Sequence, residues 1–217
     1  MNDADNNHRC PLCLSAEIDK LDFCFKRKEF LCCSHCFLMF VDRGSLPDAQ
    51  IEKERYLLHQ NYDNQDGYIS FLEKAVIPLL PLINSNDIGL DYGCGPSKTL
   101  SDLFLSYGIQ CNVYDPFFYP EINESEYDFI VSTEVFEHFH FPGKEIAKLL
   151  SILKVGGYLA VMTELWDKKE NLHQWYYIRD ITHVSFYHHN TLKYLAQTYN
   201  LEIIYMDDER VVVFQKQ

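Results

Sequence analysis

The sequence predicts an α/β fold in which a mostly parallel sheet, flanked by helices, follows a small module held by cysteines. Three observations support this prediction. A glycine-rich turn follows a short apolar stretch, Ile88 to Asp91, and a helix-compatible segment comes after it. A second β-prone stretch ends in Asp115, roughly 20 residues further on, as in nucleotide-binding α/β units. Two Cys-x-x-Cys pairs precede both features.

The overall composition limits the class of protein. The chain has 217 residues, 47% of them apolar, which suffices for one domain plus a small module. The net charge of −13 argues against a nucleic acid as the main partner, because a phosphate backbone needs a basic face. No apolar run approaches the ~18 residues that span a membrane, and residues 1–7 are polar, unlike an export signal. We therefore expect a cytoplasmic protein without a membrane segment; the sequence does not indicate an oligomeric state.

The N-terminal module has the spacing of a metal site. Cys10 and Cys13 form one pair, and Cys33 and Cys36 form the other. Two such turns aim four thiolates at one tetrahedral centre, and the residues between them, Leu21 to Leu31, predict a β-hairpin. Because four protein ligands leave no open coordination position, we expect a structural zinc rather than a catalytic one.

Alternative ligands remain open at this point. Cys32 is adjacent to Cys33 and could replace it, and His8 or His35 could supply an imidazole. Similar cysteine turns also hold iron. Two disulfides are disfavoured because the expected compartment is reducing.

The chain divides into three predicted parts. Residues 1–47 form the zinc ribbon, 48–84 a helical linker that can act as a lid, and 85–217 the α/β domain. Within the linker, helices are predicted for Ile51 to Leu58 and for Tyr68 to Leu80 from their apolar spacing.

The glycine-rich turn after Asp91 predicts a ligand site. Gly93 and Gly95 would let the backbone approach a ligand that any side chain would exclude. A dinucleotide fingerprint needs a third glycine where Lys98 stands, so a nicotinamide-dependent oxidoreductase is disfavoured. A carboxylate such as Asp115 suits a ribose diol because it accepts two hydrogen bonds at once.

The remaining elements follow in an α/β order. The stretch between Asp115 and Tyr127 is too short for a helix and a strand, so one βα unit is predicted to be cut down or absent. Phe117 and Phe118 in this stretch could stack on an adenine or be core residues. Later elements are a strand at Phe129 to Val131, a helix at Glu145 to Leu153, a strand at Tyr158 to Met162, a helix at Thr191 to Tyr199, and a terminal hairpin of Leu201 to Tyr205 with Val211 to Phe214.

These motifs together resemble the class I S-adenosylmethionine (SAM) methyltransferases over residues 68–217. The resemblance rests on Asp91-Tyr92-Gly93-Cys94-Gly95, on Glu134-Val135-Phe136-Glu137-His138, and on the Leu-Lys-x-Gly-Gly sequence from Leu153. Asp180-Ile181-Thr182-His183 with Phe186, and a segment from Tyr56 to Phe71, resemble a zinc-ribbon subgroup with domains of type 11, 12 or 23. The resemblance implies a Rossmann-like sheet with an antiparallel C-terminal hairpin.

It also implies a set of site residues. The residues that would bind SAM are Tyr68, Asp91, Gly93, Cys94, Gly95, Asp115, Pro116, Thr133 and Glu134. His138 and His183 are the candidates for a catalytic base, and Glu164 is a further carboxylate of interest.

The predicted function is transfer of the methyl group of SAM to an unidentified small molecule or protein. The reaction is an in-line displacement, for which the protein supplies alignment and exclusion of water. A base is needed only if the acceptor carries a proton at working pH. The alternative is a catalytically silent domain that binds SAM, or a partner through its ribbon.

Overall fold

A six-stranded sheet forms the centre of the computed structural model, which describes residues 9–47, 65–122 and 126–217. The strand order is β5-β4-β6-β7-β10-β9, in which the first four strands are parallel and the last two are antiparallel. The strands are β4 (Ile88–Tyr92), β5 (Gln110–Tyr114), β6 (Tyr127–Thr133), β7 (Leu153–Met162), β9 (Leu201–Met206) and β10 (Val211–Lys216). The predicted α/β sheet with an antiparallel C-terminal hairpin is thereby confirmed.

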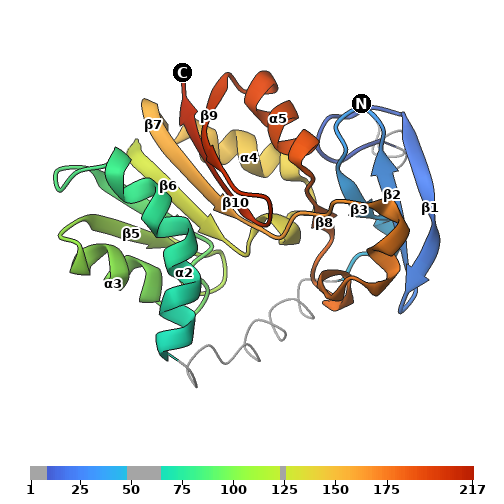
Figure 1. The fold of residues 1–217 in the computed structure, drawn as a ribbon, viewed down its shortest axis with the longest axis horizontal. Helices are drawn as coiled ribbons and strands as arrows, with labels where there is room; N and C mark the ends of the chain where they lie inside the picture. Colours follow the sequence, from blue (N-terminus) through green and yellow to red (C-terminus); the bar gives the residue numbers. More distant parts are fainter. Residues whose placement is uncertain (1–8, 48–64, 123–125) are drawn as a thin grey trace.

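Helices cover both faces of the sheet (Figure 1). Along β6, Phe129 and Val131 pack with one helical layer, while Ile130 between them packs with the other. This alternation explains why the central strands are apolar at successive positions. The first layer contains α2 (Gln65–Leu79) and α3 (Thr99–Ser106), and the second contains α4 (Pro142–Ser151) and α5 (His189–Thr198).

The connection after β5 is short, as predicted. Asp115 and Tyr119 form an isolated β-bridge, and the described residues between β5 and β6 contain no helix or further strand. β7 begins at Leu153 rather than at the predicted Tyr158. Gly156 and Gly157 lie within the strand, where the pairing of β6 with β7 shifts register, so these glycines accompany an irregularity instead of ending an element.

The N-terminal segment forms a second sheet together with a strand from the α/β domain. Its order is β1-β2-β3-β8. The strands are β1 (Ile18–Phe25), β2 (Lys28–Cys33), β3 (Met39–Val41) and β8 (Ser185–Phe186). A short 3-10 turn, η2 (Arg43–Ser45), follows β3 in the chain. Met39 pairs with Phe186, and the ring of Phe186 lies 6.0 Å from that of Phe30. The ribbon (β1 to β3, blue in Figure 1) therefore shares a sheet and a core with the rest of the chain.

The linker is described only from Gln65 onward. The helix predicted at Ile51 to Leu58 lies outside the described residues, whereas the one predicted at Tyr68 to Leu80 is α2. Pro78 lies in its last turn, and the chain continues as the 3-10 turn η3 (Leu80–Leu82). None of the described helices combines the length and the apolar content needed to span a lipid bilayer.

Candidate functional site

A cavity of about 1030 Å³ lies at the carboxyl ends of β4, β5 and β6. Ligands bind at this edge of parallel sheets because the loops there diverge. Most of the residues predicted from the sequence line this cavity: Tyr68, Gly93, Cys94, Gly95, Asp115, Pro116, Thr133, Glu134, His138 and His183. Asp91 is the one predicted binding residue that is not on the cavity wall.

The turn after β4 is held against its neighbouring strands. The backbone N–H groups of Gly93 and Cys94 both donate to the carbonyl oxygen of Tyr114, at 2.7 and 3.1 Å. Gly93 has a φ of +86°, and a Cβ at this position would lie 2.4 Å from a methyl carbon of Val135. Gly95 has a φ of +63°, and a Cβ there would meet nothing within 4 Å. The turn therefore needs glycine for its shape and presents the Gly95 backbone toward open space.

Asp115 connects this turn to the segment after β5. Its Oδ2 accepts a hydrogen bond from the N–H of Gly95 at 3.0 Å, and its Oδ1 accepts from Phe117 at 2.8 Å and Phe118 at 3.2 Å. These bonds fix the carboxylate at the cavity wall. Both lone pairs of Oδ1 and one of Oδ2 are used by these bonds, so Oδ2 can still accept a hydrogen bond from a ligand hydroxyl.

Asp91 lies behind the turn. Its side chain is buried, with 2% exposure. Burial and the nearby charge of Asp115 raise the pKa of Asp91 to about 8. Asp91 is the second-last residue of strand β4, just before the glycine turn. Its part in binding a ligand stays a prediction.

Glu134 occupies a strained position just after β6. Its φ is +54°, in the region that favours glycine. Oε2 lies 3.2 Å from the hydroxyl oxygen of Tyr177, whose one proton is donated at 2.6 Å to the deeper Glu137. The buried Oε1 lies 3.8 Å from an Arg210 guanidinium nitrogen and has no hydrogen bond. Burial raises the pKa of Glu134 to about 7, although Arg210 opposes the shift. Tyr177 and Arg210 also line the cavity. They come from segments distant in the sequence, so no local motif identified them as site residues.

Glu137 lies deeper, in the 3-10 turn η4 (Phe136–His138). It is completely buried and accepts hydrogen bonds from Tyr177 Oη at 2.6 Å and Thr163 Oγ1 at 2.8 Å. Burial and the neighbouring Glu134 carboxylate raise the pKa of Glu137 to about 8. Glu137 was predicted only as part of the motif from Glu134 to His138. The motif itself does not distinguish this buried carboxyl from the partly exposed one of Glu134.

The two candidate histidines lie together. The centroids of their rings are 4.9 Å apart, although His183 follows His138 by 45 positions in the sequence. Nδ1 of His138 lies 3.0 Å from the carbonyl oxygen of Thr182, and Nδ1 of His183 lies 2.8 Å from that of Tyr177. A carbonyl oxygen only accepts, so Nδ1 carries the proton in both rings and the lone pair is on Nε2.

Glu164 has a structural role. It does not line the cavity, and its carboxylate accepts from Trp175 Nε1 at 2.7 Å, from Tyr176 Oη, and from Arg210 at 3.0 Å. These contacts connect the 3-10 turn η6 (Tyr176–Arg179) to the end of the sheet. Another 3-10 turn, η5 (Lys169–Gln174), precedes η6 in the chain. Because its oxygens are engaged, Glu164 is a poor candidate for a catalytic carboxylate.

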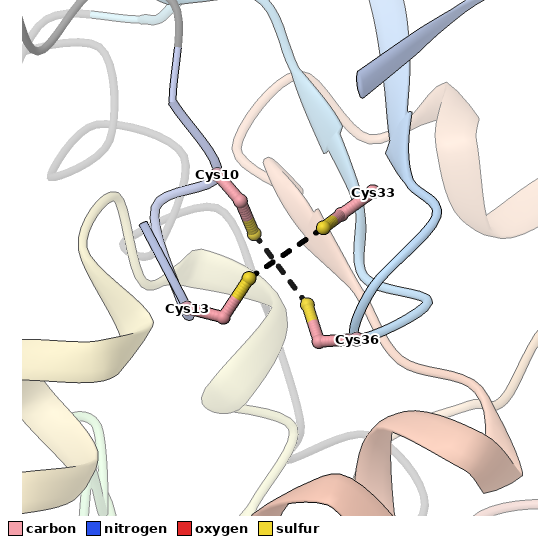
Figure 2. Close-up of side chains that lie close together, drawn as sticks. All are labelled: Cys10, Cys13, Cys33 and Cys36. Atoms are coloured by element: carbon pink, nitrogen blue, oxygen red, sulfur yellow. Dashed lines mark hydrogen bonds between the residues drawn. The ribbon is translucent and has the colours of Figure 1, made fainter. Parts of the chain in front are cut away.

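The four predicted cysteines converge from two turns, as Figure 2 shows. Sγ of Cys10 is 3.5 Å from Sγ of Cys36, and Cys13 is 3.5 Å from Cys33. A disulfide would need about 2.05 Å, whereas a tetrahedral zinc with Zn–S bonds of about 2.3 Å has an S–S edge of about 3.8 Å. The thiols therefore fit a tetrahedral metal site.

Two of the alternative ligands, Cys32 and His35, are not part of this group. Cys32 is buried in a separate apolar cluster with Phe30 and Met39, so its suggested exchange with Cys33 is wrong. The ring of His35 packs against Tyr194, at 5.4 Å. His8 lies outside the described residues.

Comparison with known proteins agrees with this geometry. A profile of the methyltransferase domain matches residues 61–206, more than half of the chain. No relative was found among curated protein sequences.

Two solved structures illustrate the shared fold. The 1,6-didemethyltoxoflavin-N1-methyltransferase of Burkholderia thailandensis, solved with 1,6-didemethyltoxoflavin and S-adenosylhomocysteine (SAH), has a TM-score of 0.58 at 12% identity, over 92% of this chain and 100% of that one. An O-methyltransferase family protein from Burkholderia thailandensis has a TM-score of 0.50 at 8% identity, over 76% of this chain and 63% of that one. The chain belongs to the methyltransferase-domain family and has the Rossmann-like fold of the SAM-dependent enzymes.

Proposed function

We propose that this protein transfers the methyl group of SAM to a hydroxyl group of a small molecule. One observation carries the proposal. A single cavity joins the glycine turn and Asp115 on one side to His138 and His183 on the other. Its volume of about 1030 Å³ is at the upper end of the range for a single drug-sized ligand, which leaves room for a donor and an acceptor together.

The donor side has the features that SAM would need. The backbone at Gly93 and Gly95 can lie close to the methionine part, because neither residue has a side chain. Asp115 would accept a hydrogen bond from a ribose hydroxyl through Oδ2, and Pro116 and Phe117 would flank the adenine. Glu134 Oε1, buried and without a hydrogen bond, would attract a positively charged group. When bound, SAM supplies an activated methyl carbon, and these residues serve to hold and orient it.

The acceptor side would belong to the two histidines. Each ring is fixed by its Nδ1–H bond to a backbone carbonyl, so Nε2 is the ring nitrogen that would receive a proton from an acceptor hydroxyl. The structure of the toxoflavin-precursor methyltransferase holds an acceptor and SAH at once, which is the occupancy that we infer for this cavity. A small molecule is favoured over a protein because the site is a cavity rather than a flat surface.

The ribbon would hold a structural zinc through Cys10, Cys13, Cys33 and Cys36. Four thiolates complete a tetrahedral sphere, so the ion itself would not contact an acceptor. Free thiols at all four positions fit a reducing compartment such as the cytoplasm.

Calorimetric titration of the zinc-loaded chain with SAH, SAM and NADH tests the proposal. We expect SAH and SAM to bind with micromolar affinity and NADH not to bind. Asp115→Ala should lose SAH binding by at least tenfold, while Asp208→Ala, at an exposed carboxyl in the last hairpin, should bind SAH like the wild type. Absence of SAH and SAM binding would refute the proposal. Binding of SAH without methyl transfer to any of a panel of phenols and hydroxy acids would favour a silent SAM-binding domain.

A further inference from the structure

A second group of side chains with metal-ligand chemistry lies in the cavity. Apart from the four cysteines, the described part of the chain brings together Glu137, His138 and His183, whose potential ligand atoms all lie within 4.8 Å of one another. All three residues line the cavity. We propose that they bind a divalent transition-metal ion whose remaining coordination positions open into the cavity.

The protonation of the two histidines suits such an ion. Each Nδ1–H donates to a backbone carbonyl oxygen, of Thr182 for His138 and of Tyr177 for His183. A metal-binding histidine typically donates its second ring nitrogen to a carbonyl or carboxylate, which fixes the ring and keeps the lone pair on the ligating nitrogen. The same arrangement is present at both residues.

Glu137 supplies the negative charge. Its carboxyl group is completely buried, and its two hydrogen-bond donors, Tyr177 Oη and Thr163 Oγ1, are neutral hydroxyls. Buried carboxylates are stable when a cation pairs with them. Nε2 of His138 lies 4.0 Å from Oε1 of Glu137, but an imidazole protonated on Nδ1 alone carries no charge to balance the carboxylate. A bound ion would neutralise the carboxylate, while the two hydroxyls keep it oriented.

The backbone holds the two ligand-bearing segments together. The N–H of Val184, next to His183, donates to the carbonyl oxygen of Glu137 at 2.8 Å. From the ribbon, Lys28 Nζ donates to the carbonyl oxygens of Asp180 and His183, at 2.6 and 3.0 Å. These bonds to backbone carbonyl oxygens hold the two segments together without involving the ligating atoms, as a preorganised site requires.

The donor set indicates the class of ion. Two imidazoles and one carboxylate suit Zn²⁺, Mn²⁺, Fe²⁺ or Co²⁺, whereas Ca²⁺ and Mg²⁺ prefer oxygen ligands. Ligands of one ion at about 2.1 Å lie roughly 3 to 3.5 Å apart, so the side chains would draw together on binding. Three protein ligands leave positions open to an exogenous oxygen. If methyl transfer is as proposed above, the acceptor hydroxyl would bind there, and the ion rather than Nε2 would lower its pKa.

Mn²⁺ binding to the zinc-loaded full-length chain tests the site directly. Mn²⁺ prefers nitrogen and oxygen ligands to thiolates, so it will not compete for the four cysteines. The electron paramagnetic resonance signal of free Mn²⁺, followed during titration, should show one tightly bound equivalent. His183→Ala and His138→Gln should each weaken this binding at least tenfold. His140→Ala removes another histidine of the cavity wall that is not in the group, and should bind Mn²⁺ like the wild type.

Two results would overturn the proposal. One is the absence of a bound equivalent in the wild type, a result that does not depend on any variant. The other is equal Mn²⁺ affinity in the wild type and all three variants, which would assign the binding to surface carboxylates of this acidic chain, whose net charge is −13. Zinc content and circular dichroism identify a variant that has lost its fold. In that case the Mn²⁺ affinity of the other histidine variant tests the proposal. SAH affinity, measured on the same samples, reports separately on the SAM binding that the proposed function requires.

Discussion

Lys28 in the ribbon donates a hydrogen bond of 2.6 Å to the backbone carbonyl of Asp180, in the segment that carries His183. The same ammonium group also reaches the carbonyl oxygen of His183, at 3.0 Å. Lys28 is 5% exposed, and burial lowers its pKa to about 8. A residue of the N-terminal ribbon therefore positions a segment of the cavity wall, which gives the ribbon a structural link to the site.

Lys28→Met tests this link. Methionine keeps much of the aliphatic stem but leaves two carbonyl groups without their donor, which costs about 1–3 kcal/mol for a buried polar group. We expect a lower free energy of unfolding in urea by about that amount, and SAH affinity close to that of the wild type. Lys26→Met, on the exposed hairpin tip, is the matched control and should change stability little. Equal stability of the two variants would show that Lys28 does not hold the segment.

Removal of a zinc ligand should affect more than the ribbon. Cys10, Cys33 and Cys36 are buried in the same apolar cluster as Tyr92 and Ile130 of the central sheet. We expect Cys36→Ser to lose the zinc, measured by elemental analysis, and to unfold at a lower temperature as one transition with the α/β domain, because the cluster is shared. Cys24→Ser changes an exposed cysteine outside the site and should retain one zinc per chain. A variant that lost its zinc but kept the melting temperature of the wild type would contradict the structural role.

Local features of the sequence were sufficient to predict most of the fold. The consecutive apolar residues of β6 and the glycine turn after Asp91 belong to short segments whose backbone form depends on neighbours in the chain. The pairing of β3 with β8 was not predicted, because Ser185–Phe186 is only two residues long and carries no periodicity.

The site was predicted less completely for a related reason. Asp115 and Gly93 were found through a motif with fixed spacing. Tyr177 and Arg210 were not found, because their relation to Glu134 arises only when η6 and the last hairpin meet at the edge of the sheet. Asp91 was predicted to bind the ligand, and that stays a prediction; spacing along a strand does not show that the residue is 2% exposed and off the cavity wall.

Gly93→Ala should abolish SAH binding. The residue has a φ of +86°, where a Cβ costs about 1–2 kcal/mol, and the added atom would also collide with Val135. The turn would have to move away from β6 and from the ligand that it is proposed to hold. Calorimetric titration with SAH measures the loss, which we expect to exceed tenfold.

Gly156→Ala is the matched control for that variant. Gly156 has a similar φ of +82°, but a Cβ there meets nothing within 4 Å, and it is not on the cavity wall. It should lose stability through backbone strain alone and bind SAH like the wild type. If Gly93→Ala bound SAH as tightly as Gly156→Ala does, the glycine turn would not be part of the SAM site.

The pH dependence of stability should depend on Asp91. Its pKa is raised from the ordinary value of about 3.9 in the unfolded chain to about 8 in the folded protein, by burial and by Asp115. Between these two values the unfolded chain releases a proton that the folded protein retains. The wild type therefore loses stability as pH rises through this window, by at most about 1.4 kcal/mol per pH unit.

Asp91→Asn removes this titration while preserving the size of the side chain. The variant should gain stability relative to the wild type from pH 5.5 to 7.5, and the difference should level off above about pH 8, where Asp91 is ionised in both states. Urea unfolding at four pH values measures the trend. Asp208→Asn, at an exposed carboxyl, controls for the loss of one negative charge. A constant difference between Asp91→Asn and the wild type across this range would mean that Asp91 is ionised in the folded protein, and a cationic partner within the loop would then have to be sought.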